Sequence, residues 1–539
     1  MTTASADGFD PAGILILDGT TTPPAAVVGG KAAGIARMTA AGLPVPPAFV
    51  LSTGSCRRFL AEGEVELDRL WPGVRAGMAH LERVTGRRFG SSRSPLLVSV
   101  RSGAPTSMPG MMDTVLNLGI DDGVERGLAE ALSPEYARDT RRRFEQQFGA
   151  VVAITGPPVD PWRQLRQAIA AVFESWRSSR AVAYRTRYGL DDSAGTAVTV
   201  QAMVYGNADA RSGTGVLFSR DPSTGAAEPF GEWLTRAQGE DVVSGTRAPR
   251  PLAELARLLP EVHARLLEHA AFLERCHRDV QDIEFTVERG QLWLLQTRSA
   301  KRSPRAAIRF AAALAREGVV EPAEAVRMVS AEQVRAALRP GLSATGRAAA
   351  ELLAQGLPVC PGVGTGVLVT DPDEAEARAA EGESVVLARR NTSPHDLHGM
   401  LAAVAIVTEV GGATSHAAVV SRELGVPCVV GCGAGSLYGH PGTMVTVCGD
   451  TGEVLRGAVA TAPALSEDND PDLRDLTKWA RQVSPLAAWR PGEGPADARA
   501  DVELATAEQI AAAWASGIRA VITEQPLPVL LTAALINSK

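Results

Sequence analysis

The stretch TEVGGATSHAAVVS (408–421) decides most of what can be predicted for this chain. The apolar run LAAVAIV (401–407) before it is typical of a buried strand, and Gly411-Gly412 give a turn that β-carbons would obstruct. Thr414-Ser415 can cap a helix that begins around His416. The sequence therefore places one imidazole in the first turn of a helix.

A histidine at a helix start suits nucleophilic attack on phosphorus. The free backbone N–H groups and the helix dipole favour a neutral imidazole there and attract an arriving anion. A neutral imidazole can attack a phosphoryl group and form a phosphohistidine. The alternative is an ordinary core or surface histidine. We predict that His416 is a catalytic residue that carries a phosphoryl group.

Length and composition indicate a multidomain globular protein. A chain of 539 residues corresponds to about three or four domains. A net charge of −7 argues against a general nucleic-acid binder. The apolar runs are far shorter than the roughly 20 residues of a membrane span, and the N-terminal sequence MTTASADGFD has no signal-peptide pattern. We expect a cytoplasmic protein that binds neither nucleic acid nor membrane.

The pattern along the chain predicts an α/β (α+β) multidomain protein. Strand-like and helix-like segments alternate through the first 300 residues, and 305–338 has the pattern of a pair of helices broken near Gly318. A second α/β domain extends from about Gly346 to Ala462, followed by an acidic stretch and a short αβ tail. We expect four parts, with boundaries at 1–300, 301–345, 346–465 and 466–539.

Two segments near the N-terminus carry side chains suited to polyphosphate. Lys31 follows two glycines and precedes a helix, so its ammonium group can lean toward phosphates. Arg101 ends a strand in VSVRSGAPTSMPGMMDTVLN (98–117), and the loop after it contains Ser107 and Gly110. Such a loop lets backbone amides approach phosphate oxygens beside the guanidinium fork. The alternative is an ordinary surface loop.

The segment QDIEFTVERGQLWLLQTR (281–298) predicts two strands joined by a tight turn. Alternation places Asp282 and Glu284 on one face, and Gln296 and Arg298 on one face of the partner strand. Magnesium polyphosphate needs oxygen ligands for the cation and a guanidinium fork for the charge that develops during transfer. The alternative is a solvent-facing hairpin with cross-strand charge pairs.

These motifs resemble those of a known family. GGATSHAAVV (411–420) resembles the phosphohistidine motif of the PEP-utilising enzymes, and 29–301 resembles the ATP-grasp domain of pyruvate phosphate dikinase. SMPGMMDTVLNLG (107–119) is the most specific part of this match. GLPVCPGVGTG (356–366) and NTSPHDLHGM (391–400) continue it through a swivelling phosphohistidine domain. Val410 and Ala413 depart from the dikinase pattern, which has a basic residue and a methionine there.

The resemblance implies an ATP-dependent phosphotransferase. In such an enzyme ATP would phosphorylate His416 with release of AMP. Phosphate would then take the terminal phosphoryl group and leave as pyrophosphate, and an acceptor such as pyruvate would take the remaining phosphoryl group. Mg²⁺ would be held by Glu284 and Gln296. Thr414 matches a threonine that is phosphorylated for regulation in plant dikinases. The implied ATP-binding residues are Lys31, Arg101, Ser107, Gly110, Asp282, Glu284, Gln296 and Arg298.

The tail resembles only the opening β-α-β unit of the family's PEP/pyruvate barrel. The phosphate-binding arginines expected in its first two strands fall on Trp489 and Ile522. We therefore expect a short form with a barrel remnant and without its own pyruvate site. Its acceptor could be pyruvate bound by a separate barrel-bearing protein, or another small molecule, as in the rifampicin phosphotransferase and glucan dikinase relatives. A different kind of function, that of a phosphocarrier or regulatory subunit, stays open.

Overall fold

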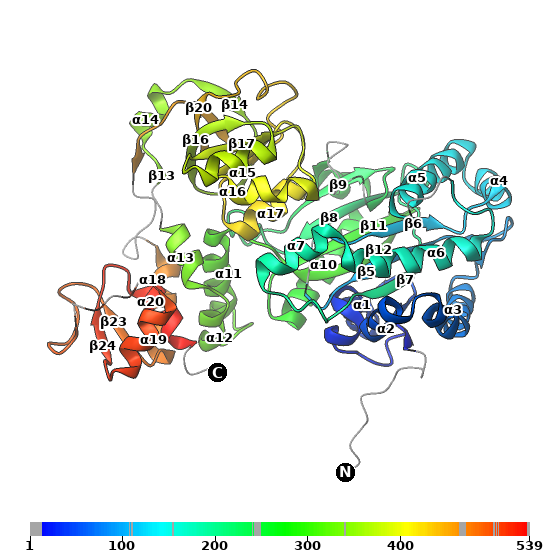
Figure 1. The fold of residues 1–539 in the computed structure, drawn as a ribbon, viewed down its shortest axis with the longest axis horizontal. Coiled ribbons are helices and arrows are strands. Elements are labelled where there is room, and N and C mark those ends of the chain that lie inside the picture. The colour runs from blue at the N-terminus through cyan, green and yellow to red at the C-terminus, as the bar shows by residue number, and fades with distance from the viewer. Residues whose placement is uncertain are drawn as a thin grey trace, which may run out of the picture.

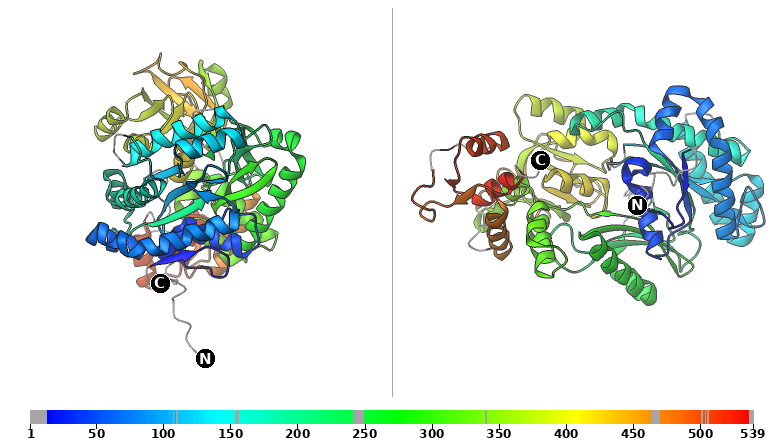
Figure 2. Two further views of the ribbon diagram at one scale, coloured as in Figure 1. Left: turned by 90° about the vertical axis from the view of Figure 1, so that its right-hand side faces the viewer. Right: turned by 90° about the horizontal axis from the view of Figure 1, so that it is seen from below.

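A computed structural model shows the chain as three lobes (Figures 1 and 2). The largest lobe contains the chain up to about residue 300, the second is built on one large sheet, and the third joins connector helices to the C-terminal segment. This architecture confirms the predicted α/β multidomain class. The structure describes residues 13–106, 108, 111–152, 156–239, 241, 249–338, 341–462, 470–499, 502, 504 and 506–535.

The first lobe contains two five-stranded antiparallel sheets, whose central strands are buried on both faces. The first sheet has the order β1-β2-β7-β5-β6, and the second has the order β10-β9-β8-β11-β12. A short parallel pair, β3 and β4, lies apart from both. The strands are β1 (Ile14–Ile16), β2 (Ala48–Leu51), β3 (Arg88–Phe89), β4 (Pro95–Leu96), β5 (Val98–Gly103), β6 (Thr114–Leu118), β7 (Ala197–Ala202), β8 (Gly213–Phe218), β9 (Phe230–Thr235), β10 (Arg250–Pro251), β11 (Gln281–Glu288) and β12 (Gln291–Ser299).

Helices pack on both sheets of this lobe and bury its apolar cores. The segment 252–274 contains two helices, because Pro260 begins a new helix and disfavours helical geometry at Leu259. The helices are α1 (Ala25–Ala40), α2 (Thr53–Glu62), α3 (Glu64–Thr85), α4 (Asp122–Ala131), α5 (Pro134–Val152), α6 (Pro161–Glu174), η1 (Ser175–Arg177), α7 (Ser179–Tyr188), α9 (Ala253–Leu258) and α10 (Pro260–His277).

The second lobe is an eight-stranded sheet in the order β14-β21-β20-β16-β17-β18-β19-β15. The strands β16 to β19 run parallel, so their carboxyl ends meet at one edge. Its elements are β13 (Gly341–Leu342), α14 (Ala344–Ala349), β14 (Leu352–Gln355), β15 (Leu357–Cys360), β16 (Val363–Val369), α15 (Pro372–Ala380), β17 (Val385–Arg389), η2 (Pro394–Asp396), α16 (Leu397–Ala402), β18 (Ala405–Thr408), α17 (His416–Leu424), β19 (Cys428–Val430), β20 (Met444–Cys448), β21 (Glu453–Arg456) and β22 (Thr461–Ala462).

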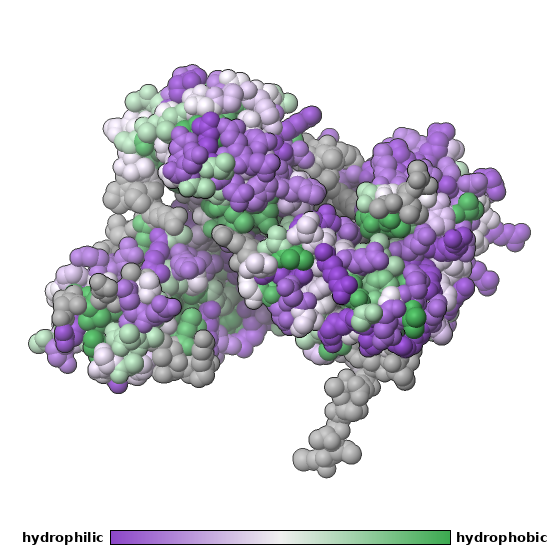
Figure 3. Space-filling model, viewed as in Figure 1, coloured by the Kyte–Doolittle hydropathy of each residue, from purple (hydrophilic) through white to green (hydrophobic). Residues whose placement is uncertain are grey.

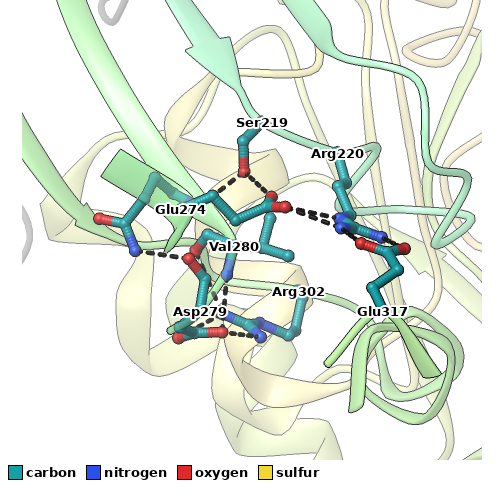
Figure 4. A network of polar contacts seen from close by, with 8 residues as sticks. Ser219, Arg220, Glu274, Asp279, Val280, Arg302 and Glu317 are labelled. Carbon is teal, nitrogen blue, oxygen red and sulfur yellow. Dashed lines mark hydrogen bonds and ion pairs between the residues drawn. The ribbon is translucent and has the colours of Figure 1, made fainter. Parts of the chain in front are cut away.

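The connector is three helices instead of the expected pair. They are α11 (Pro304–Arg316), α12 (Pro322–Arg327) and α13 (Ala331–Ala337). Capping boxes at Glu321 and Ser330 start the second and third helices, which the sequence pattern had merged. Arg220 anchors α11 to the first lobe, because it binds Glu274 on α10 and Glu317 beside α11 at the same time (Figure 4).

The C-terminal segment packs on these connector helices in one apolar core. It contains α18 (Pro471–Val483), β23 (Ala487–Trp489), α19 (Ala507–Ala515), β24 (Ala520–Ile522) and α20 (Pro526–Ala534). β23 and β24 form a parallel pair, and within the described residues no closed barrel is formed. This part of the structure thus contains a β-α-β unit, as the sequence predicted.

Hydrophilic residues cover most of the face seen in Figure 3 in all three lobes. Across the described part of the chain, no helix combines the length and the apolar character that crossing a membrane requires.

Candidate active site

The β11–β12 hairpin brings four of the predicted residues onto one face. In the antiparallel register Asp282 lies opposite Arg298, and Glu284 lies opposite Gln296. Arg298 Nε donates to Asp282 Oδ2 at 2.8 Å. Asp282 raises the pKa of Arg298 above its usual range, so this guanidinium stays charged. The hairpin therefore presents two carboxylates, an amide and a guanidinium together.

Arg101 reaches this hairpin from the end of β5 in the other sheet. Its Nη2 lies 3.3 Å from Glu284 Oε2 and 3.4 Å from Gln296 Oε1. Burial would raise the pKa of Glu284, but Arg101, Arg298 and Lys31 outweigh burial and lower it. Glu284 is thus ionised. The long contacts leave Arg101 free to turn toward an arriving anion.

Lys31 lies on α1 and completes the set of cations. Gly29 interrupts this helix with φ 76°, and a β-carbon there would lie 1.9 Å from the carbonyl oxygen of Gly103. The close approach brings α1 against the strand that carries Arg101. Burial, together with the nearby Arg101 and Arg298, lowers the pKa of Lys31 to about 7, while Glu284 opposes this shift. The sequence predicted a helix that starts after the glycines; α1 extends from Ala25, but its helical geometry is broken at Gly29, and the segment that carries Lys31 resumes the helix after this kink.

The structure brings six of the eight predicted ATP-binding residues together. Ser107 and Gly110 lie outside the described residues. The six that share this face are Lys31, Arg101, Asp282, Glu284, Gln296 and Arg298.

The carboxylates fit a hard divalent cation. Asp282 Oδ1 is buried and has no hydrogen-bond partner among the described residues, so one carboxylate oxygen is available. Glu284 and Gln296 add oxygen donors beside it. Within the described residues no group of three or more His, Cys, Asp or Glu side chains could hold a metal by itself. Mg²⁺ commonly uses one or two carboxylates together with substrate phosphates, and this donor set meets that need.

His416 is the first residue of α17, which follows β18 across the glycine turn. Its Nδ1 lies 3.2 Å from the Thr392 hydroxyl, while its Nε2 is buried and has no partner within the described part of the chain. Burial lowers the pKa of His416 to about 4, and Asp396 offsets part of this effect. The imidazole is therefore neutral at physiological pH. Sequence reasoning missed Thr392, although it lies in the matched segment 391–400.

The turn before His416 is held differently from the prediction. Ser415 occupies the N-cap position, but its hydroxyl makes no capping hydrogen bond. Glu232 from β9 instead accepts hydrogen bonds from the Ala413 N–H at 2.8 Å and from the Thr414 N–H at 3.2 Å. The Thr414 hydroxyl also donates to Glu232, at 2.5 Å. A β-carbon at Gly412 would lie 2.4 Å from the same carboxylate.

Glu232 thus binds the histidine lobe, the lobe that carries His416, to the first lobe. An ion pair between Lys301 and Glu423 at 2.7 Å and a hydrogen bond from the Ser223 hydroxyl to the Val359 carbonyl at 3.0 Å join the same two lobes. No local signal in the sequence identifies Glu232, because its partners lie about 180 residues away.

In the C-terminal segment, Trp489 and Ile522 stand opposite each other at the ends of β23 and β24. Neither side chain can bind a phosphate by charge. Arg481 packs over the ring of Trp489, 4.3 Å from its centroid.

Two family models match the chain. The one described as pyruvate phosphate dikinase, AMP/ATP-binding domain, matches residues 68–253, and the one described as PEP-utilising enzyme, mobile domain, matches residues 381–452. The first match includes Arg101 and Glu232, and the second includes Thr392 and His416.

Several relatives named pyruvate, phosphate dikinase match 88% of the chain. The protein of Rhizobium meliloti (strain 1021) is 40% identical, and the chain covers 60% of it. Pyruvate, phosphate dikinase 1, chloroplastic, of Arabidopsis thaliana is 39% identical and 55% covered. Pyruvate, phosphate dikinase 2 of Zea mays is 38% identical and 60% covered. The chain thus spans a little over half the length of these relatives.

Proposed function

Because the chain belongs to the pyruvate phosphate dikinase family over its matched domains, we propose that it is a phosphotransferase that binds MgATP and phosphorylates His416 with release of AMP. One observation carries this proposal. The histidine lobe, which carries a neutral imidazole with an unpaired Nε2, is bound to the lobe that contains the six converging polar side chains. We propose the divisions 1–300, 301–345, 346–465 and 466–539 as its functional parts.

The side chains suit an attack by Nε2. With the Nδ1 proton donated to Thr392, Nε2 carries the lone pair. It attacks the β-phosphorus of ATP, an N–P bond forms, and the bond from that phosphorus to the oxygen it shares with the α-phosphate breaks, so AMP leaves. Arg101, Arg298 and Lys31 would hold the phosphates and stabilise the developing charge. Mg²⁺, held by Glu284 and Gln296 with Asp282 beside them, would neutralise phosphate charge when bound.

We propose that phosphate then takes the terminal phosphoryl group as pyrophosphate, and that the remaining phosphohistidine serves an acceptor. Trp489 and Ile522 occupy the positions where the family resemblance places phosphate-binding arginines. This favours an acceptor other than pyruvate, or pyruvate held by a separate barrel-bearing protein, over pyruvate bound by these residues. The same substitutions keep a phosphocarrier role as the second candidate function.

Isotope exchange tests the proposal. The 539-residue chain is expected to exchange labelled AMP into ATP in the presence of Mg²⁺ and phosphate or pyrophosphate, with pyruvate-dependent AMP release near background. Conversion of pyruvate to PEP by this chain alone at about 1 per second or more, an ordinary enzyme rate, would refute the acceptor proposal. Absence of any exchange would favour the carrier role and refute ATP chemistry.

ATP binding is expected to be coupled to proton uptake at Lys31. With a pKa of about 7, the free lysine is half protonated at pH 7 and mostly neutral at pH 8. A bound polyanion raises this pKa, so the uptake due to Lys31 should rise from about half a proton at pH 7 to nearly one at pH 8. Calorimetry in buffers of different ionisation enthalpy measures this uptake. Lys31→Met should remove the pH-dependent part, whereas Lys301→Met should retain it.

Thr414→Glu is expected to lower His416 phosphorylation by at least about 100-fold, because like charges forced together cost several kcal/mol. The new carboxylate would face Glu232 in a contact where Thr414 is 4% exposed. Thr414→Val keeps both backbone bonds to Glu232 and should lose only about tenfold. Adding Glu232→Gln to Thr414→Glu should recover part of the activity. A fully active Thr414→Glu protein would disprove this role.

The same contact supports Thr414 as a regulatory site. We propose that a kinase reaches this buried hydroxyl only when the histidine lobe has moved away from Glu232. The added phosphate would then repel Glu232 and prevent the lobe from binding there again.

A further inference from the structure

Arg422 is a buried arginine whose hydrogen-bonding groups are mostly unused. It lies on α17 after His416, and its side chain is less than 2% exposed. Its Nη1 donates to the Ala413 carbonyl oxygen at 2.9 Å. Its Nε and Nη2 are buried and have no hydrogen-bond partner among the residues that the structure describes. Among the residues that the structure describes, no other arginine has two such nitrogens.

The buried Arg220 and the largely buried Arg302 show what a structural arginine looks like in this protein. All three nitrogens of Arg220 bind the carboxylates of Glu274 and Glu317 (Figure 4). All three nitrogens of Arg302 bind Asp279 or backbone carbonyls. A buried N–H group without an acceptor costs about 1–3 kcal/mol, so the two free donors of Arg422 call for an explanation.

The guanidinium lies beside the nucleophile turn and over the ring of Phe218, which is the cross-strand neighbour of Asp282. Side chains on a helix lean toward its N-terminus, and the bond to Ala413 holds the Arg422 head beside that turn. Burial lowers the pKa of Arg422, while Asp282 and Glu232 of the first lobe are near enough to act against burial. No hydrogen bond joins Arg422 to Asp282, whose own Oδ1 is also unpaired.

A purely structural role is the main alternative. Arg422 packs over the ring of Phe218, 5.5 Å from its centroid, and its bond to Ala413 could simply hold the turn. One nitrogen suffices for that bond. The two remaining donors point to an anion that the protein itself does not provide.

We propose that Arg422 is a catalytic residue that binds non-bridging oxygens of the phosphoryl group during its transfer to His416. This inference rests on the proposed function. The N–P bond forms and the bond to AMP breaks as described above, and Arg422 transfers no proton. Its fork adds positive charge where negative charge develops. Because it shares α17 with His416, this charge moves with the nucleophile when the lobe moves.

Single-turnover phosphorylation of His416 at saturating MgATP tests the role. Arg422→Gln should slow the transfer by on the order of 100-fold or more, as removal of a transition-state donor does, with the Kd for ATP changed less than about threefold. Arg422→Lys keeps the charge and should fall between. Arg302→Gln is the control, since it removes a largely buried arginine whose three nitrogens all have partners, and it should transfer at nearly the wild-type rate.

A thio-substitution experiment distinguishes direct contact of Arg422 with the phosphoryl group from a purely structural role. Sulfur in place of one non-bridging oxygen on the β-phosphate should slow the wild-type protein more than Arg422→Gln or Arg422→Lys, because the contact is already lost in the variants. An unchanged thio effect in a slow variant, or a wild-type rate in Arg422→Gln, overturns the proposal while leaving His416 as the carrier. A wild-type protein that never phosphorylates His416 overturns both the proposed function and this role.

Discussion

His416→Asn is expected to abolish the phosphorylation of the chain by MgATP. In the structure Nε2 is unpaired, and the pKa of about 4 keeps the ring neutral and nucleophilic throughout the physiological range. Asparagine has no such lone pair, so the loss should exceed about 1,000-fold, as expected when a nucleophile is removed. Label from β- or γ-³²P-ATP should be stable in alkali and lost in acid in the wild type.

His398→Asn is the matched control for this experiment. His398 lies on α16 in the same lobe, and its Nε2 is 2.8 Å from Asp373 Oδ1. This variant should retain the label. The low pKa of His416 also sets the acid limit, because the ring gains a proton only as the pH falls toward 4. Label that persists in His416→Asn would refute the assignment of the carrier residue.

Local patterns predicted the hairpin that binds the nucleotide in our proposal. Strand residues alternate between faces, so the spacing of Asp282 and Glu284, and of Gln296 and Arg298, was enough to place them together once the turn was recognised. The same reasoning predicted a helix that starts near His416, because the glycine turn and the apolar residues on both sides are neighbours in the chain.

Contacts between lobes could not be predicted in this way. Glu232 and the turn that it holds are far apart in sequence. The turn is held by the Glu232 carboxylate, and the predicted capping hydrogen bond of Ser415 is not formed. The unpaired donors of Arg422 likewise depend on which groups surround α17 in three dimensions. Sequence spacing describes one element at a time, whereas these residues act where two lobes meet.

Arg298→Ala and Glu284→Ala are each expected to remove most of the phosphorylation of His416. Arg298 is the arginine on the polar face of the hairpin and is bound to Asp282, while Glu284 contacts Arg101 from the opposite sheet. Each substitution would strip a charge partner from the polyphosphate and its cation. The expected loss of transition-state stabilisation is on the order of 2–4 kcal/mol, or about 30- to 1,000-fold in rate.

Arg87→Ala distinguishes this effect from damage to the hairpin. Arg87 pairs at 2.8 Å with Glu288 at the far end of β11, so the variant breaks an ion pair on the same strand without touching the nucleotide face. It should phosphorylate His416 within about threefold of the wild-type rate, as expected for a partly exposed ion pair. If Arg298→Ala and Glu284→Ala behaved like Arg87→Ala, the polar face of the hairpin would be structural. ATP would then have to be bound by other residues, because this face holds the converging cations and carboxylates on which the proposal depends.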